Sequence, residues 1–199
     1  MLKRNQTQNL ALAVAVAVSL ASSTLTHAGT LSGKVSTGKG SVVYVEAIAG
    51  KTFPPPASPV TVDQERLTFK PHVAIVPVGS TVNFVNKDNV AHNIFWPSVG
   101  GNRKQSHNLG TWPTGETRSF KFDSTGVVPL LCNVHAEMSA YVVVVPTPYY
   151  AMTDESGSYS LANLPDGQYK VSAWHEGMKV ETKPVSVASN TTLDFALSK

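Results

Sequence analysis

Cysteine, charged residues and long apolar runs are all scarce in this chain of 199 residues. The single cysteine, Cys132, excludes an internal disulfide bond. Charged residues make up 15% of the sequence, the net charge is only +3, and no run of Lys or Arg exceeds two residues. These values argue against a nucleic-acid-binding protein. Helical periodicity is also lacking after residue 28, which excludes a helical bundle.

Valine and threonine dominate the composition, with 27 and 18 residues respectively. Their β-branched side chains pack well in pleated sheets, while 14 Gly and 13 Pro residues provide turns. Short strand-like runs separated by turn signals predict an all-β chain with one large or two small sandwiches. The predicted strands cover Leu31–Val35, Val42–Ile48, Ala74–Val78, Thr81–Asn86, His92–Phe95, Thr117–Phe122, Gly126–Leu131, Ala140–Val145, Ser158–Ala162, Gln168–Trp174, Glu181–Val187 and Thr191–Leu197.

The first residues have the pattern of a targeting segment. Lys3 and Arg4 precede an apolar run over Leu10–Ala21, and small residues follow up to Ala28. This run is shorter than the roughly 17 to 25 residues of a membrane-spanning helix, so an N-terminal membrane anchor is the less favoured alternative. Residues 1–28 are predicted to be a signal peptide, with export to the periplasm. In that oxidising compartment an unpaired Cys132 needs burial or a protective role, such as metal ligation.

The strongest local motif is a loop between two apolar strands in which Cys132, His135 and Met138 occur three residues apart. Soft sulfur ligands combined with imidazole favour copper, and two histidines, one cysteine and a weak axial methionine make a blue-copper site. His92, at the start of a predicted strand, is the candidate for the second histidine.

Two asparagines adjoin these candidate ligands. Asn93 and Asn133 are expected to support the metal site through hydrogen bonds, because metal ligands are oriented by such outer contacts. Taken singly, the candidate ligands have plainer interpretations: Cys132 and Met138 as core residues, and His92 as a strand-end histidine.

The run over Gly79–Asn86, the following His92 and the Cys132–Met138 loop resemble the cupredoxin family of type 1 blue-copper domains, in its amicyanin- and plastocyanin-like branch. The likeness covers roughly Gln64 to Val145. It implies a Greek-key β-sandwich, one copper ion per chain, and ligation by His92, Cys132, His135 and Met138. The sequence departs from this pattern at Ala136, where such loops usually have proline, and in an insert over Pro97–Asn108.

The flanks resemble a different module. Gly29–Val35 and Val42–Ile48 are similar to the opening strands of a carboxypeptidase-regulatory-like, transthyretin-like sandwich, and Thr153–Leu161 with Leu164–Val171 are similar to its later strands. The predicted organisation is therefore opening strands over 29–50, a Pro-rich connector over 51–63, the copper domain over 64–146 and the rest of the split sandwich over 147–199. Some proteins of this fold bind carbohydrate, which makes carbohydrate a weak candidate ligand.

The favoured hypothesis is an exported electron carrier that is not an enzyme. Four protein ligands leave no open position on the metal for a substrate. The electron would pass through an exposed edge of His135 to a redox partner protein. Trp96, Pro97 and Ala136 are predicted to line the surface on which this partner docks transiently.

Two other functions remain open from the sequence alone. In one, the split sandwich is an adaptor or carbohydrate-binding module, and the copper site is structural or sensory. In the other, the chain is a copper enzyme, which would need further histidines around an open metal. His72, His107 and His175 lack ligand spacing and are expected at the surface.

Overall fold

The computed structural model describes residues 28–199, which form two β-sandwiches and one short 3-10 helix, η1 (Arg103–Gln105). The predicted signal peptide, residues 1–28, lies outside the described residues except for Ala28. Within residues 28–199, no helix has the length and apolar character needed to cross a membrane.

The first sandwich is formed by the middle of the chain and packs two sheets face to face. One sheet has the order β5-β11-β10-β7-β8 and the other the order β4-β3-β6-β9. Their strands are β3 (Val60–Gln64), β4 (Phe69–Lys70), β5 (Val73–Pro77), β6 (Thr81–Asn86), β7 (His92–Trp96), β8 (His107–Trp112), β9 (Thr117–Lys121), β10 (Gly126–Leu131) and β11 (Ser139–Val145).

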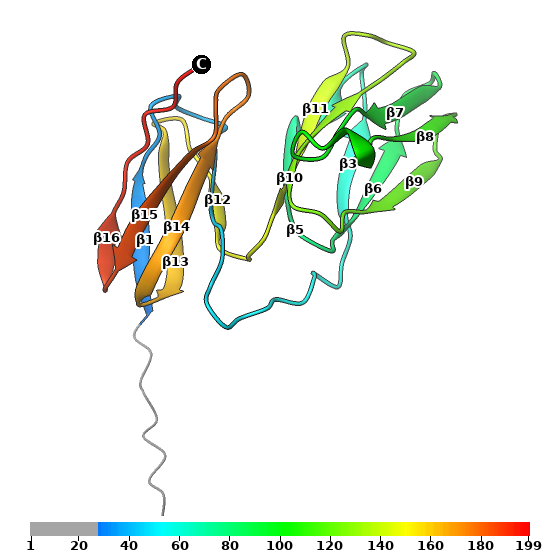
Figure 1. Cartoon of the computed structure of the whole chain (residues 1–199). Coiled ribbons are helices and arrows are strands. Elements are labelled where there is room, and N and C mark those ends of the chain that lie inside the picture. Colours follow the sequence, from blue (N-terminus) through cyan, green and yellow to red (C-terminus); the bar gives the residue numbers. More distant parts are fainter. Residues whose placement is uncertain (1–27) are drawn as a thin grey trace, which may run out of the picture.

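The second sandwich combines the two ends of the described chain. Its sheets have the orders β13-β1-β16 and β12-β2-β14-β15. Figure 1 shows the blue strand β1 lying among yellow, orange and red strands. The strands are β1 (Ala28–Lys34), β2 (Val42–Val45), β12 (Tyr150–Met152), β13 (Ser158–Pro165), β14 (Gly167–Trp174), β15 (Glu181–Val187) and β16 (Asn190–Thr192). The predicted all-β fold, with a smaller sandwich made from both flanks, is confirmed.

Each sandwich has its own hydrophobic core. The core of the first contains Phe84, Ile94 and Leu130, all fully buried, and it also includes Cys132 and Met138. The core of the second is a separate cluster that includes Leu31, Val43, Leu161, Leu164 and Val171. Burial of this apolar surface supplies the main driving force for folding of both units.

Strand β11 explains how the two sandwiches meet. Its residues Val142–Val145 are all buried, although alternate side chains of a strand point to opposite faces. Val142 and Val144 belong to the first core, whereas Val143 and Val145 pack with Val42 and Trp174 of the second sandwich. The four valines in a row are therefore a strand with both faces covered.

Some strands were not predicted. Strand β3 begins at Val60, inside the predicted connector 51–63, and pairs in parallel with β6. Strand β8 begins at the last two residues of the predicted insert and pairs with β7. The short strands β4 and β12 complete the edges of their sheets. At the C-terminus the predicted strand Thr191–Leu197 is reduced to β16 and an isolated bridge at Phe195.

Gly126 tests the contact between the insert and the sheet. A Cβ atom at this position would lie 2.7 Å from the Gly100 Cα, and the Gly126 φ is 134°. We expect Gly126→Ala to lower the free energy of unfolding by at least about 2 kcal/mol, because backbone atoms must move and the dihedral is strained. Urea titration of both proteins measures this change.

Gly101→Ala is the matched control. Gly101 also has a positive φ, of 83°, but a Cβ atom there would meet nothing within 4 Å. Only the dihedral cost of about 1 kcal/mol is expected. Equal losses in the two variants would contradict the close approach of the insert to β10.

Candidate metal centre

The candidate metal centre lies at one end of the first sandwich. His92 is the first residue of β7, and Cys132 directly follows β10, which pairs antiparallel with β7 through Leu131 and Phe95. This pairing places the start of β7 beside the loop that joins β10 to β11. His135 and Met138 belong to that loop, so two strands and one short connection bring the predicted residues together.

The structure brings three of the predicted ligand groups within reach of one ion. The ligand atoms of His92, Cys132 and His135 all lie within 4.8 Å of one another. The Nδ1 atoms of the two histidines face each other at 3.1 Å. His92 and Cys132 are buried, whereas His135 is half-buried, so the group has one edge open to solvent.

Asp88 fixes the orientation of His92. The His92 Nε2–H donates to Asp88 Oδ2 at 2.8 Å, and a carboxylate only accepts, so the proton of the neutral ring is on Nε2. The His92 Nδ1 lone pair is therefore free and directed at His135. A carboxylate behind a histidine is the usual arrangement for a metal ligand, because it sets the tautomer and the basicity of the ring.

The Asp88 carboxylate is itself held in place. It accepts the backbone N–H groups of Arg66 and Leu67, from the turn between β3 and β4, at 2.5 and 2.9 Å. Burial alone would raise the pKa of Asp88, but the hydrogen bonds from these two N–H groups and from His92 lower it overall. Asp88 thus stays ionised and links the turn to the metal centre.

The loop after β10 is fixed by its own hydrogen bonds. The His135 N–H donates to the Cys132 Sγ at 3.4 Å, and the Met138 N–H donates to the His135 carbonyl at 3.1 Å. The Asn93 Oδ1 accepts the backbone N–H of Asn133 at 3.3 Å, which joins β7 to this loop. Asn133 contributes its backbone, while its side chain is exposed.

Asn93 is in turn anchored from the other side. Its Nδ2 donates to the Asn108 Oδ1 and to the Gly110 carbonyl, each at 2.8 Å. The Gln64 side chain, which is fully buried, donates to the Asn93 carbonyl at 3.5 Å. Strand β8 and strand β3 therefore support the metal centre from both sheets.

The donor set fits a copper ion. With Nε2 of His92 protonated, two imidazole nitrogens and a cysteine sulfur converge on one small space, in which unshared electron pairs would repel each other unless a proton or a cation lies between them. Imidazole and thiolate are the ligands that copper prefers. Met138 is buried at the same end of the core, with 1% of its surface exposed, and can bring a thioether to this space.

Sequence reasoning missed Asp88 and Gln64. An acidic residue four positions before the candidate ligand His92, in a polar loop, was a usable signal for Asp88. No comparable signal marks Gln64, since its role depends on the parallel pairing of β3 with β6.

The prediction for the docking surface needs correction at Trp96. The Trp96 side chain is 1% exposed, and its Nε1 donates to the Gln105 carbonyl at 3.1 Å. It lies at the end of β7 away from His92, about 13 Å along the strand. Pro97 and Ala136 are exposed, but only Ala136 adjoins His135.

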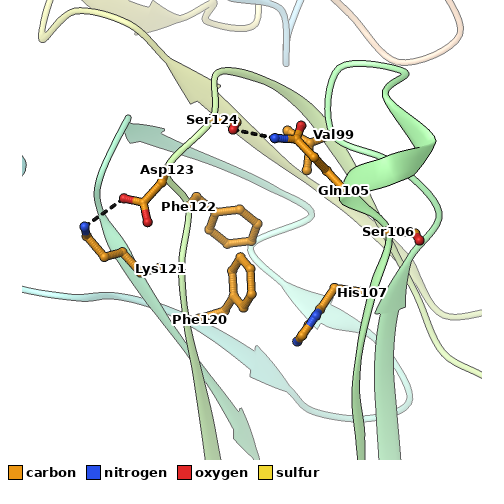
Figure 2. A pocket seen from close by; sticks show the side chains of 9 residues that line it. All are labelled: Val99, Gln105, Ser106, His107, Phe120, Lys121, Phe122, Asp123 and Ser124. Atoms are coloured by element: carbon orange, nitrogen blue, oxygen red, sulfur yellow. Dashed lines mark hydrogen bonds and ion pairs between the residues drawn. The ribbon is translucent and has the colours of Figure 1, made fainter.

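Trp96 instead belongs to an aromatic cluster behind a pocket of about 260 Å³. Its ring lies 4.7 Å from that of Phe120 and 5.2 Å from that of His107. Figure 2 shows Phe120 and Phe122 facing into this pocket beside His107. Above them, the Gln105 side chain donates a hydrogen bond to the Ser124 hydroxyl. Packing at the edge of the sandwich, rather than a docking role, thus accounts for Trp96.

The other histidines of the described chain do not belong to the group of candidate ligands. His107 is exposed on β8, His175 follows β14, and His72 precedes β5 and pairs with Glu176. Two aromatic residues of the second sandwich, Tyr159 and Tyr169, are buried, with 5% and 7% of their surface exposed. These buried rings cannot stack on a sugar.

Comparison with family models finds a match for each part of the chain. Residues 57–145 match copper binding proteins of the plastocyanin/azurin family, and residues 136–198 match the carboxypeptidase regulatory-like domain. The middle of the chain, which carries the two histidines and the cysteine, is therefore similar to the plastocyanin/azurin family of copper-binding proteins. The C-terminal part is similar to the carboxypeptidase regulatory-like domain.

Solved structures of cupredoxins align with part of this chain. A reduced mutant of amicyanin aligns with 21% identity over 45% of this chain and 84% of its own, with a TM-score of 0.41. A purple cupredoxin from Nitrosopumilus maritimus aligns with 27% identity over 43% and 98%, with a TM-score of 0.38. A copper-containing nitrite reductase from Thermus scotoductus SA-01 aligns with 27% identity over 52% of this chain but 25% of its own, with a TM-score of 0.42. No curated protein matches the chain.

Asp88→Asn tests the hydrogen bonds behind His92. The amide has one oxygen in place of two, so at least one of the three N–H groups now bonded to Asp88 loses its acceptor. We expect the free energy of unfolding of the metal-free protein to fall by about 1–3 kcal/mol. Asp123→Asn is the control, because Asp123 is an exposed residue paired with Lys121 and its loss should cost at most about 0.5 kcal/mol. If both variants unfold at the same urea concentration, Asp88 has no special structural role.

Proposed function

We propose that this protein is an exported, periplasmic electron carrier with one type 1 copper ion per chain. His92, Cys132 and His135 would be the principal ligands that hold the ion, and the Met138 thioether would be a weaker one. The convergence of the two histidine Nδ1 atoms and the cysteine sulfur at one end of the sandwich supports this proposal most strongly. Copper bound there supplies a one-electron couple between Cu(I) and Cu(II).

The surrounding residues favour electron transfer over turnover of a substrate. His92 is held by Asp88, and the loop with Cys132 and His135 is held by Asn93, so the ligands need to move little when the charge of the site changes. Four protein ligands also leave no position for a substrate. A stiff, closed site is suited to passing electrons, and we therefore propose that the protein is not an enzyme.

The half-buried edge of His135 is the proposed route for the electron. Three of the large hydrophobic side chains exposed on the described chain belong to segments around the metal centre: Leu67, Val90 and Val134, with 39%, 41% and 50% of their surface exposed. The Leu67 backbone N–H donates to the Asp88 carboxylate. Val90 is two residues before His92, and Val134 directly precedes His135. We propose that these residues, with Ala136, form the docking surface for a redox partner protein, which binds transiently over a small area.

Loss of the cysteine sulfur tests the copper assignment. The protein loaded with Cu(II) should bind about one copper per chain and show the intense visible band of copper–thiolate bonding. In Cys132→Ser this band should disappear, since the thiolate is removed. His107→Gln, which changes an exposed histidine on β8, is the control and should retain the band at full intensity. A colourless wild-type protein with copper bound would overturn the electron-carrier assignment.

The docking surface can be tested without knowing the partner, through electron exchange between reduced and oxidised copies of the protein. Val134→Lys places a charge where two copies must meet, and like charges across a contact are unfavourable. The self-exchange rate, measured by NMR line broadening in mixtures, should fall by at least about tenfold.

Thr125→Lys adds the same charge at the opposite end of the sandwich. Thr125 is exposed and precedes β10, whose six residues separate it from Cys132 by roughly 20 Å. The self-exchange rate of this control should remain near that of the wild type. If both variants exchange equally slowly, net charge rather than the surface around His135 controls the reaction.

A further inference from the structure

The two sandwiches share a hydrophobic junction close to the metal loop. Trp174, at the end of β14, is 5% exposed and lies 5.1 Å from the Tyr141 ring of β11. Val42 and Val143 are buried in the same cluster. Trp174 does not belong to the core of either sandwich, so its main contacts are those between the two units.

A polar contact closes the rim of this junction. The Glu176 carboxylate of the second sandwich accepts a hydrogen bond from the His72 Nε2–H at 2.7 Å. This hydrogen bond lowers the pKa of Glu176, against the opposing effect of burial, while burial and the neighbouring Glu176 charge raise the pKa of Tyr141. His72 also packs edge-on against Tyr141, with ring centroids 5.8 Å apart.

Tyr141 and His72, which contact the second sandwich at the junction, lie next to the loop that carries the metal ligands. Tyr141 is three residues from Met138, and its N–H donates to the His72 carbonyl at 2.8 Å. His72, Met138 and Ser139 line the same small cavity, of about 290 Å³. One side of His72 thus faces the second sandwich, while the same residue borders the methionine of the metal centre.

We propose that Trp174 and Glu176 are positioning residues for the metal centre: by holding Tyr141 and His72, the carboxypeptidase-regulatory-like sandwich sets the position of Met138. The inference rests on the proposed function for its effect on electron transfer, but the positioning itself exists in the metal-free protein. The second sandwich is then a structural part of the redox unit. Its removal changes the site even though it contributes no ligand.

The experiment uses the full chain in its metal-free form and then loaded with copper. In Trp174→Ala, amide NMR signals of Met138 and Ser139 should shift more than the average for the first sandwich, because β11 loses the ring that packs on Tyr141. Glu176→Ala, which removes only the rim contact, should produce a smaller change in the same residues. After copper loading, both variants should have a reduction potential different from that of the wild type. Trp174→Phe, which keeps an aromatic ring, should have NMR signals and a reduction potential close to those of the wild type.

Leu161→Ala separates positioning from general loss of stability. Leu161 is buried in the core of the second sandwich and is outside the junction cluster, so its truncation destabilises that unit without releasing Tyr141. This control should leave the Met138 signal and the potential unchanged. The proposal is overturned if, in Trp174→Ala and Glu176→Ala, the NMR signals of Tyr141 shift but those of Met138 and Ser139 do not, and the reduction potentials equal that of the wild type. Failure to bind copper would instead overturn the proposed function, and the metal-free spectra would still decide the positioning.

Discussion

The approach of two imidazole nitrogens to 3.1 Å is the constraint on which the functional site depends. Asp88 accepts a hydrogen bond from the His92 Nε2–H on one side of the ring. The Nδ1 atom on the other side therefore has only a lone pair to direct at His135. Such an arrangement is stable when a proton or a metal cation lies between the rings, and the adjacent cysteine sulfur favours a soft metal. The fold holds the pair together because β7 and the loop after β10 come from paired strands.

The parts of the site that were predictable are those encoded by local spacing. Cys132, His135 and Met138 lie in one loop, so their proximity follows from the sequence alone, and His92 was recognisable from the strand before it. Gln64 was not predictable, because its contact depends on how β3 packs against β6 and β7. Asp88 had a local signal, its place four residues before His92, but its bonds to the turn between β3 and β4 depend on tertiary packing. The burial of Trp96 was missed for a related reason: the predicted strand ended at Phe95, and β8, which pairs with Trp96 through His107, was not predicted.

The same limit applies to the fold. The valine-rich run Val142–Val145 predicts a strand, yet it does not reveal what covers each of its two faces. One face belongs to the first core and the other to the junction with the second sandwich, whose strands come from both ends of the chain. Pairing between segments so distant in sequence leaves no local trace, and only the resemblance of the flanks to a known module suggested it. Strand β3 was missed because the four prolines that precede it, the last of them Pro59, are typical of a connector.

The position of the junction also bears on how such a protein exchanges electrons. The second sandwich covers the outer face of β5, β11 and β10, whereas His135 lies in a loop at the end of these strands and retains a half-buried edge in the full chain. A partner protein can therefore reach His135 while the second sandwich stays in place. The junction contacts β11 three residues from Met138 and leaves the His135 edge open. The proposed positioning of Met138 would therefore act from behind the metal centre and would not compete with the proposed docking surface. A module placed over the end of the sandwich would instead cover His135, so the observed insertion of one sandwich into the other is compatible with the proposed role of electron carrier.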